Sequence, residues 1–282
     1  MSNIGHLALR YLTTGLALVL TTAQISAAPI GEATKAKNQV TGQLGPVSQR
    51  ISIGSNVSTD EVVSTGTSSS TELLFLDDST LAIGAGSSVA LDRYVYDPNS
   101  GAVDTLINMS KGAMRFVSSG QRTRNATIAI PNATIGIRGT EMIVNCPGSS
   151  PCEIGFKSGS GRVCPYPEGT QVTQQFRNAC QSGNDAVLPC GYYDLTAEDE
   201  QTSDDEGNFM TVGLNCAVTP PVTVDPSAFT FIGQQIAAGA SIPGGIITTS
   251  FASVVPATII PCAAMTAAAI AVVAVPATLN EP

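Results

Sequence analysis

The stretch Ala126–Val144, which reads ATIAIPNATIGIRGTEMIV, carries the strongest indication of the fold. Within it, apolar residues occupy alternate positions in three places: Thr127–Ile130, Thr134–Ile137, and the pair Met142 and Val144. A period of two puts successive side chains on opposite faces of an extended chain, so each run predicts a β-strand. A Pro-Asn pair and an Arg-Gly-Thr triplet interrupt the runs, and we expect both to be turns.

The residues before this stretch show the same pattern. Short β-prone runs span Thr71–Leu76, Thr80–Ile83 and Ser88–Leu91, and the segments Asp77–Ser79 and Gly84–Ser87 separate them as turns. No window of eleven or more residues in this half has the apolar spacing of an amphipathic helix. The first half is therefore predicted to be all-β, as a sandwich, a barrel or a small solenoid.

Four stretches, taken in order, resemble the FecR domain, a bacterial extracytoplasmic β-domain: Val57–Gly66, Thr71–Leu91, Asn108–Val117 and Ala126–Val144. The last stretch contains the most specific mark, IGIRGT, after a suitable series of strands. The resemblance covers roughly residues 38–145. It implies a small, twisted, solenoid-like β-domain outside the cytoplasm, in a protein-binding or sensing setting.

The sequence also departs from the family pattern. Asp78 stands where the family usually has a turn glycine, so we expect a turn that does not need a positive φ. Ile130 stands where the family often has threonine before the proline. The regulators that name the family begin with a cytoplasmic segment that binds a sigma factor, followed by a membrane helix. We expect neither here, so the resemblance does not carry the anti-sigma function over to this sequence.

The signature Gly136, Ile137, Arg138, Gly139 and Thr140 also has a physical interpretation. Gly136 lies between two isoleucines and allows the backbone of a neighbour to approach closely. Gly139 permits a left-handed turn, and Arg138 can reach carbonyls or an acid across it. We expect these roles to be structural rather than ligand-binding.

The chain of 282 residues has a single histidine, His6, which lies in the expected signal peptide. A mature chain without histidine excludes Ser-His-Asp and Cys-His nucleophiles and histidine-bound zinc. No nucleophile elbow, phosphate loop or zinc-protease motif occurs. The glycine-rich run Gly155–Gly161 is expected to be a flexible turn, and the adjacent acids Asp77 and Asp78 to belong to a turn. We therefore predict no enzyme, no catalytic residues, no cofactor and no metal site.

The N-terminus is typical of a secretory signal. Arg10 precedes the apolar run Leu12–Leu20, and small residues follow it. The apolar core is too short to span a bilayer comfortably, so residues 1–27 are predicted to be a signal peptide cleaved after Ala27. The alternative is an uncleaved N-terminal anchor.

The cysteines agree with export. Six of the seven lie close together in a Gly-, Pro- and Ser-rich stretch, and no C-x-x-C pair indicates metal binding. In an oxidising compartment this pattern predicts disulfides, with a metal site as the less favoured alternative. Their connectivity stays open, and Cys262 is the candidate for the unpaired residue. The disulfide candidates are Cys146, Cys152, Cys164, Cys180, Cys190 and Cys216.

Charge and composition divide the chain into a signal peptide (1–27), a FecR-like β-domain (29–145), an acidic Cys-rich segment (146–228) expected to be loop-rich, and an apolar tail (229–282). Residues 29–145 hold nine basic and ten acidic residues, whereas residues 146–282 hold three basic and twelve acidic residues.

Two segments of the second half leave alternatives open. The run Asp194–Glu206 holds seven acids and is expected to be a solvated loop; it lacks the spacing of a calcium loop, and its charge argues against nucleic acid. The run Val254–Leu279 has 26 uncharged residues, which is long enough to span a membrane. Three prolines interrupt it and no basic residue flanks it, so a packed apolar segment is favoured over an anchor.

These observations predict an exported, non-catalytic protein of the periplasm or cell envelope of a Gram-negative bacterium. We expect it to bind a protein partner in the cell envelope or to sense a signal, using exposed strand edges for β-augmentation. The alternative is a structural envelope or surface protein that is anchored or assembled through its apolar tail. A calcium-stabilised module is a third hypothesis.

Overall fold

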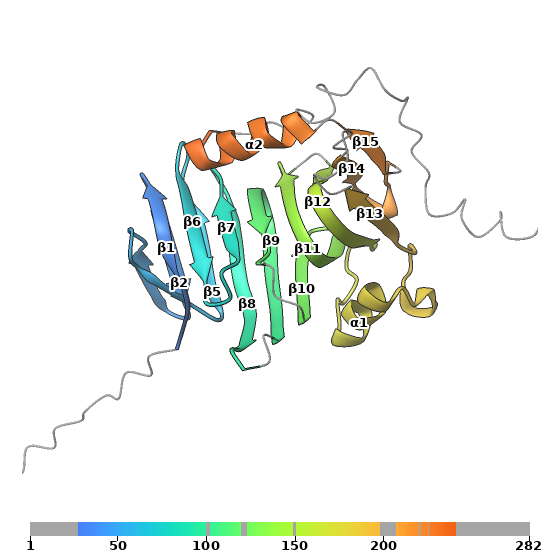
Figure 1. Cartoon of the computed structure of the whole chain (residues 1–282), viewed down its shortest axis with the longest axis horizontal. Coiled ribbons are helices and arrows are strands. Elements are labelled where there is room, and N and C mark those ends of the chain that lie inside the picture. Colours follow the sequence, from blue (N-terminus) through green and yellow to red (C-terminus); the bar gives the residue numbers. More distant parts are fainter. Residues whose placement is uncertain are drawn as a thin grey trace, which may run out of the picture.

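A computed structural model describes residues 28–99, 102–119, 123–148, 151–197, 207–219, 221–224 and 226–240. These residues are mostly β-structure, as predicted, and their strands belong to one sheet (Figure 1). The strands are β1 (Pro29–Lys37), β2 (Val40–Leu44), β3 (Val47–Arg50), β4 (Asn56–Ser58), β5 (Glu61–Thr65), β6 (Ser70–Phe75), β7 (Thr80–Ile83), β8 (Ser88–Asp97), β9 (Ala102–Val117), β10 (Thr123–Ile130), β11 (Ala133–Cys146), β12 (Cys152–Pro165), β13 (Tyr193–Ala197), β14 (Gly207–Val212) and β15 (Val222–Val224).

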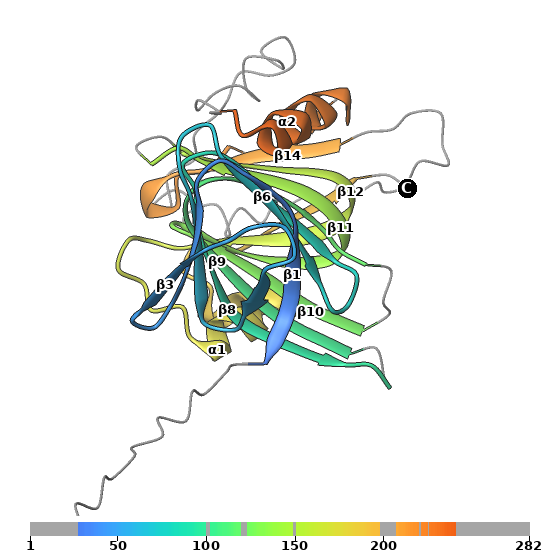
Figure 2. The same ribbon diagram turned by 90° about the vertical axis from the view of Figure 1, so that its left-hand side faces the viewer.

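Three long strands, β9, β11 and β12, organise the sheet because each half of a strand pairs with a different neighbour. The first half of β9 pairs with β8 and β10, and its second half pairs with β7 and β11. β12 pairs with β11 along its length, with β14 through its first half and with β13 through its second half. The sheet therefore curls around a shared interior (Figure 2).

The bend in β11 and β12 is a β-bulge at the signature. Gly139 and Thr140 of β11 lie opposite the single residue Gly159 of β12, and both glycines have positive φ, of 56° and 74°. A Cβ atom at Gly159 would lie 1.8 Å from the carbonyl oxygen of Gly139. The two paired strands therefore approach each other too closely for any side chain at Gly159.

Thr140 holds the bulge together through its backbone and its hydroxyl. Its N–H donates to Ser118 Oγ at 2.7 Å, and its carbonyl accepts from the Ser118 N–H at 2.9 Å. Its Oγ1 lies 2.7 Å from the Ser160 carbonyl and 2.9 Å from the Arg138 carbonyl. These bonds join β11 to β12 and to the end of β9 at the point where the ladder is interrupted.

The inner faces of the strands form one large apolar core. The alternation predicted from the sequence is observed, since Ile128, Ile135 and Ile137 are buried and belong to this core. Fully buried bulky side chains from the long strands fill its centre: Ile107, Met109, Met114, Phe116, Met142 and Phe156.

Two helices cover parts of the outer face. α1 (Gln174–Ser182) packs on β11 and β12 through Phe176, Ala179 and Cys180. α2 (Pro226–Ala238) crosses β6, β7, β9, β11 and β12 and buries Ile232 and Ile236 (Figure 1). None of the described helices has the length and apolar character required to cross a bilayer.

Several sequence-based expectations are wrong in detail. Arg138–Thr140 is a bulge inside the continuous strand β11, because hydrogen bonds from Thr140 carry the pairing across it. Gly155–Gly161 is strand rather than flexible turn, since its glycines accommodate the close crossing and the ring of Phe156. The segment 146–228 is less loop-rich than expected, and β12, β14 and β15 extend the same sheet past residue 145.

The solenoid is not confirmed. The sheet is open, and among the described strands β9 and β10 alone pair in parallel. The strands also vary in length from three to sixteen residues, so they do not form the regularly repeated coils of a solenoid.

The turn between β6 and β7 behaves differently from our expectation at Asp78. Asp78 adopts a positive φ of 66°, so an aspartate occupies the left-handed position that a glycine would take. Asp77 is buried, and its Oδ1 accepts from Ser79 and from the Tyr94 hydroxyl at 3.0 Å. The two acids thus belong to a turn, as predicted, and not to a pair of catalytic carboxylates. Burial beside Asp77 raises the pKa of Tyr94.

Four predictions fall outside the described residues: the signal peptide at 1–27, most of the acidic run, the apolar segment 254–279 with its proposed membrane association, and the unpaired Cys262. They remain predictions.

The close crossing makes Gly159 indispensable to the sheet. We expect Gly159→Ala to lower the free energy of unfolding by about 3 kcal/mol, because a methyl group must displace the backbone of β11 in addition to adopting a positive φ. Gly45→Ala is the matched control, since Gly45 has a φ of 54° with no atom near its missing Cβ; we expect it to cost about 1 kcal/mol. Denaturant unfolding measures both, and equal costs would contradict the role of the crossing.

Candidate functional site

A groove of about 450 Å³ opens on the outer face of β11, β12 and β13, beside the end of α1. The alternate residues on these strands face the core, so the groove floor is the polar side of the sheet. The floor consists of two rows of residues that lie opposite one another across the strands: Arg138, Ser160 and Thr196 form one row, and Gly136, Arg162 and Asp194 form the next.

The C-terminal end of α1 forms one wall of the groove. The disulfide between Cys164 of β12 and Cys180 fixes this helix to the sheet, with Cα atoms 5.9 Å apart. Gly136 lies beneath the helix, and a Cβ there would lie 3.3 Å from Cγ of Gln181. The Gln181 amide donates to Thr127 Oγ1 at 3.0 Å. The absence of a side chain at Gly136 therefore lets α1 settle on the sheet and leaves the groove open.

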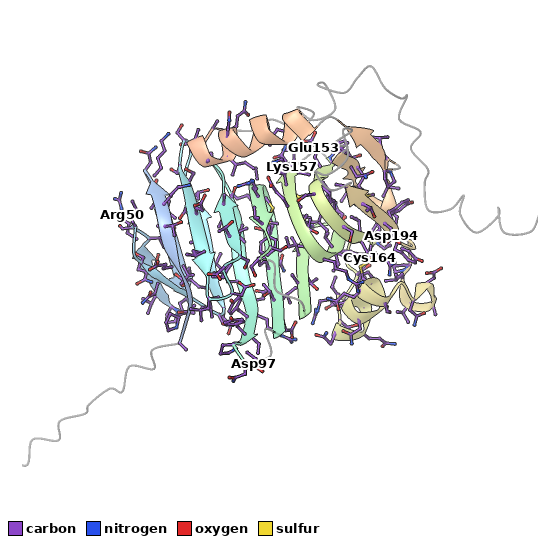
Figure 3. All side chains as sticks on the ribbon, in the orientation of Figure 1. Arg50, Asp97, Glu153, Lys157, Cys164 and Asp194 are labelled. Carbon is purple, nitrogen blue, oxygen red and sulfur yellow. A yellow bond between two sulfur atoms is a disulfide. The ribbon has the colours of Figure 1, made fainter. Side chains whose placement is uncertain are left out.

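Arg162 connects the groove floor to its wall. Its Nε and Nη2 donate to the two carboxylate oxygens of Asp194 at 2.6 and 2.9 Å, a bidentate pair that raises the pKa of Arg162. Its Nη1 lies 3.3 Å from the carbonyl of Gln181, and its guanidinium lies 4.2 Å from the ring centroid of Tyr192. Arg162 thus neutralises Asp194 and satisfies a carbonyl at the end of α1. Figure 3 shows Asp194 and Cys164 beside this helix.

Arg138 differs from Arg162 because its guanidinium is available. Its side chain is exposed, and among the described residues it has no ion pair or hydrogen bond of its guanidinium. The acid or carbonyl partner that we expected for it is therefore not found in this part of the chain. The groove accordingly carries one net positive charge, in a chain whose net charge is −9.

The structure separates the signature residues by role. Ile137 belongs to the core, whereas Gly139 and Thr140 form the bulge that ends the groove. Gly136 and Arg138 line the groove, and Ile137 contributes to the lining between them. Sequence reasoning missed the remaining lining residues Ser160, Gly161, Arg162, Gln181, Ser182, Asp194 and Thr196.

One signal in the sequence could have identified part of this set. Arg162 precedes Cys164 by two residues, which places both on one face of a strand. Asp194 was assigned to a solvated acidic run, and its pairing with Arg162 depends on the register between β12 and β13.

All six predicted cysteines are joined in disulfides. The structure pairs Cys146 with Cys152, Cys164 with Cys180, and Cys190 with Cys216. Within the described ranges, no cluster of three or more histidine, cysteine or acidic residues could hold a metal ion.

Comparison with known proteins identifies the sheet. Residues 61–160 match the model of the family described as FecR protein. These residues are a FecR domain. The match extends beyond residue 145 into β12 and ends at residue 160. It includes both strands of the bulge and the groove residues Gly136, Arg138 and Ser160.

The chain resembles two crystal structures, at 1.65 and 2.50 Å resolution, of one protein from Parabacteroides distasonis ATCC 8503. That protein is described as a candidate anti-sigma factor. Each has 13% sequence identity and a TM-score of 0.40, over 60% of this chain and 62% of the other. The present chain thus spans less than two thirds of that protein's length in those structures. No curated protein matches the sequence.

The role of Arg162 in holding α1 can be separated from its ion pair. We expect Arg162→Lys to lower the free energy of unfolding by about 1–2 kcal/mol, because an ammonium group cannot reach Asp194 and the end of α1 together. Asp194→Asn is the control and should cost less than about 1 kcal/mol, since the Asp194 side chain is 54% exposed and solvent screens the pair. Equal costs, with unchanged hydrogen exchange in α1, would show that Arg162 does not hold the helix.

Tyr166 gives the packing of α1 a pH dependence. Its hydroxyl donates to the Ile130 carbonyl at 2.6 Å, and its ring meets Phe176 edge-on, with centroids 5.7 Å apart. Burial raises the pKa of Tyr166 to about 12 from the ordinary value of 10.0. The folded state therefore holds the phenol proton more tightly than the unfolded state does.

The contribution of Tyr166 should be complete below pH 10 and should decline as the pH rises from 10 to 12. We expect the stability difference between the wild type and Tyr166→Phe to shift by about 2 kcal/mol against the wild type across this range. Groups common to both proteins, including Tyr94, cancel in the difference. A difference that does not change with pH, measured by chemical denaturation, would contradict this assignment.

Proposed function

We propose that this chain is an exported, non-catalytic signalling module that binds a protein partner through its FecR domain. The groove over β11, β12 and β13 is the observation that carries the proposal. It lies on the outer face of the sheet, where β11 and β12 of the domain meet β13 and α1, and its floor is polar. The apolar core on the inner face of these strands is packed without the groove side chains, so these side chains are available for recognition.

The chemistry of the groove supports binding rather than catalysis. Its lining contains hydroxyls, an amide, one ion pair and one available guanidinium, but no histidine, cysteine thiol or lysine. Serine hydroxyls without an adjacent base are weak nucleophiles. The groove can therefore hold a polar segment by hydrogen bonds and charge.

The disulfides support a location outside the cytoplasm. Disulfides persist in oxidising compartments such as the periplasm and are rare where thiols are kept reduced. Three disulfides in one chain, together with the signal sequence predicted at residues 1–27, favour export to the periplasm or cell envelope.

Site-specific photo-crosslinking of the full chain in its host tests the proposal. Benzoylphenylalanine at Thr196 or Ser182 should give the same defined protein adduct after irradiation, because both residues are exposed at the groove. The same group at Val47, which is 61% exposed on β3, is the control and should not give that adduct. The adduct protein, once purified, should bind the purified chain. Exported chain that gives no groove-specific adduct would overturn the proposal.

A further inference from the structure

We propose that the groove recognises a carboxylate, the side chain of an aspartate or glutamate on an extended segment of the partner, and that Arg138 is the residue that binds it. This inference rests on the proposed function and names the chemistry of the partner. It comes from the pairing of charges within the groove.

The two arginines of the groove are not equivalent. Arg162 has both carboxylate oxygens of Asp194, a carbonyl of α1 and the ring of Tyr192 as partners, so its donors are committed. Arg138 lies one row away, exposed, with no partner for its guanidinium among the described residues. A planar guanidinium presents two parallel donors that match the two oxygens of a carboxylate.

Two hydroxyls continue the row that Arg138 begins. Ser160 lies directly opposite Arg138, and Thr196 lies directly opposite Ser160. Neighbouring strands are about 4.8 Å apart, so the three side chains extend about 10 Å across the sheet. A bound carboxylate at Arg138 would therefore have hydroxyl donors and acceptors beside it for the flanking backbone of an extended segment.

The groove fits a single negative charge better than a double one. Arg162 and Asp194 cancel, which leaves Arg138 as the net charge. The Asp194 side chain is 54% exposed, so a phosphate group with about two negative charges at neutral pH would meet a carboxylate as well as a guanidinium. A carboxylate carries one charge and satisfies Arg138 without that excess.

The charge of the whole chain favours a protein segment over a small free acid. The net charge of −9 repels anions at a distance. Contacts to Ser160, Thr196 and the end of α1 can offset that repulsion for a segment several residues long, whereas a small carboxylate reaches Arg138 alone.

The test uses the purified, disulfide-intact full chain and two matched peptides, acetyl-Thr-Val-Glu-Val-Thr-amide and its Gln counterpart. Nuclear magnetic resonance titration should show shifts at Arg138, Ser160 and Thr196, with the Glu peptide binding about fivefold more tightly than the Gln peptide. Arg138→Gln should abolish this preference while leaving the fold intact. Arg50→Gln, an exposed arginine on β3 at the opposite end of the molecule (Figure 3), should preserve it.

Other outcomes reject the inference in distinct ways. Equal binding of the Glu and Gln peptides, a preference that survives Arg138→Gln, or no saturable shift up to about 10 mM peptide would overturn it. Sodium acetate binding as tightly as the Glu peptide would show that a small acid is sufficient and would overturn the protein source.

Failure here is distinguishable from failure of the proposed function. A groove adduct in cells that forms equally with Arg138→Gln would support a protein partner and reject the carboxylate. Carboxylate selectivity in vitro without any adduct in cells would support binding of a carboxylate by Arg138 and reject the proposed protein partner.

Discussion

The close crossing of β11 and β12 is the constraint on which the rest of the structure depends. The backbone of Gly159 lies so close to that of Gly139 that no side chain fits at Gly159, and Thr140 bridges the interrupted ladder with hydrogen bonds of its own. Both strands bend there. One half of β11 pairs with β10 and the other half with β9, while one half of β12 pairs with β13 and the other half with β14. A curled sheet with a single large core follows from that local geometry.

The same bend determines where the outer face of the sheet stays open. On the side of the bulge that holds the start of β11 and the end of β12, α1 partly covers the outer face of these strands. The Cys164–Cys180 disulfide and Arg162 hold this helix in place. Between the helix and the bulge, two rows of the sheet stay open and form the groove. The core and the groove thus lie on opposite faces of the same strands. The inward residues Ile135 and Ile137 pack the core, and the alternate residues Gly136 and Arg138 line the site.

Local patterns were the reliable part of the sequence. Alternation located the inward isoleucines of β10 and β11, because a period of two depends only on neighbouring residues, and β-prone composition between turns located β7 at Thr80–Ile83. Turn chemistry was less reliable. Gly155–Gly161 and Arg138–Thr140 have the composition of turns but form strand, because hydrogen bonds from residues distant in the sequence continue the pairing through them. Asp78 accepted the left-handed conformation that we expected its turn to avoid.

The sequence by itself determined the β class, the family resemblance and the set of cysteines that form disulfides. The tertiary structure alone decided which cysteines pair, that the strands form an open curled sheet, and that Asp194 neutralises Arg162 while no described residue forms an ion pair with Arg138. The physical reason is the range of the interactions. Side-chain periodicity is encoded within a few residues, but an ion pair between β12 and β13 depends on register between strands about thirty residues apart, which no local pattern specifies.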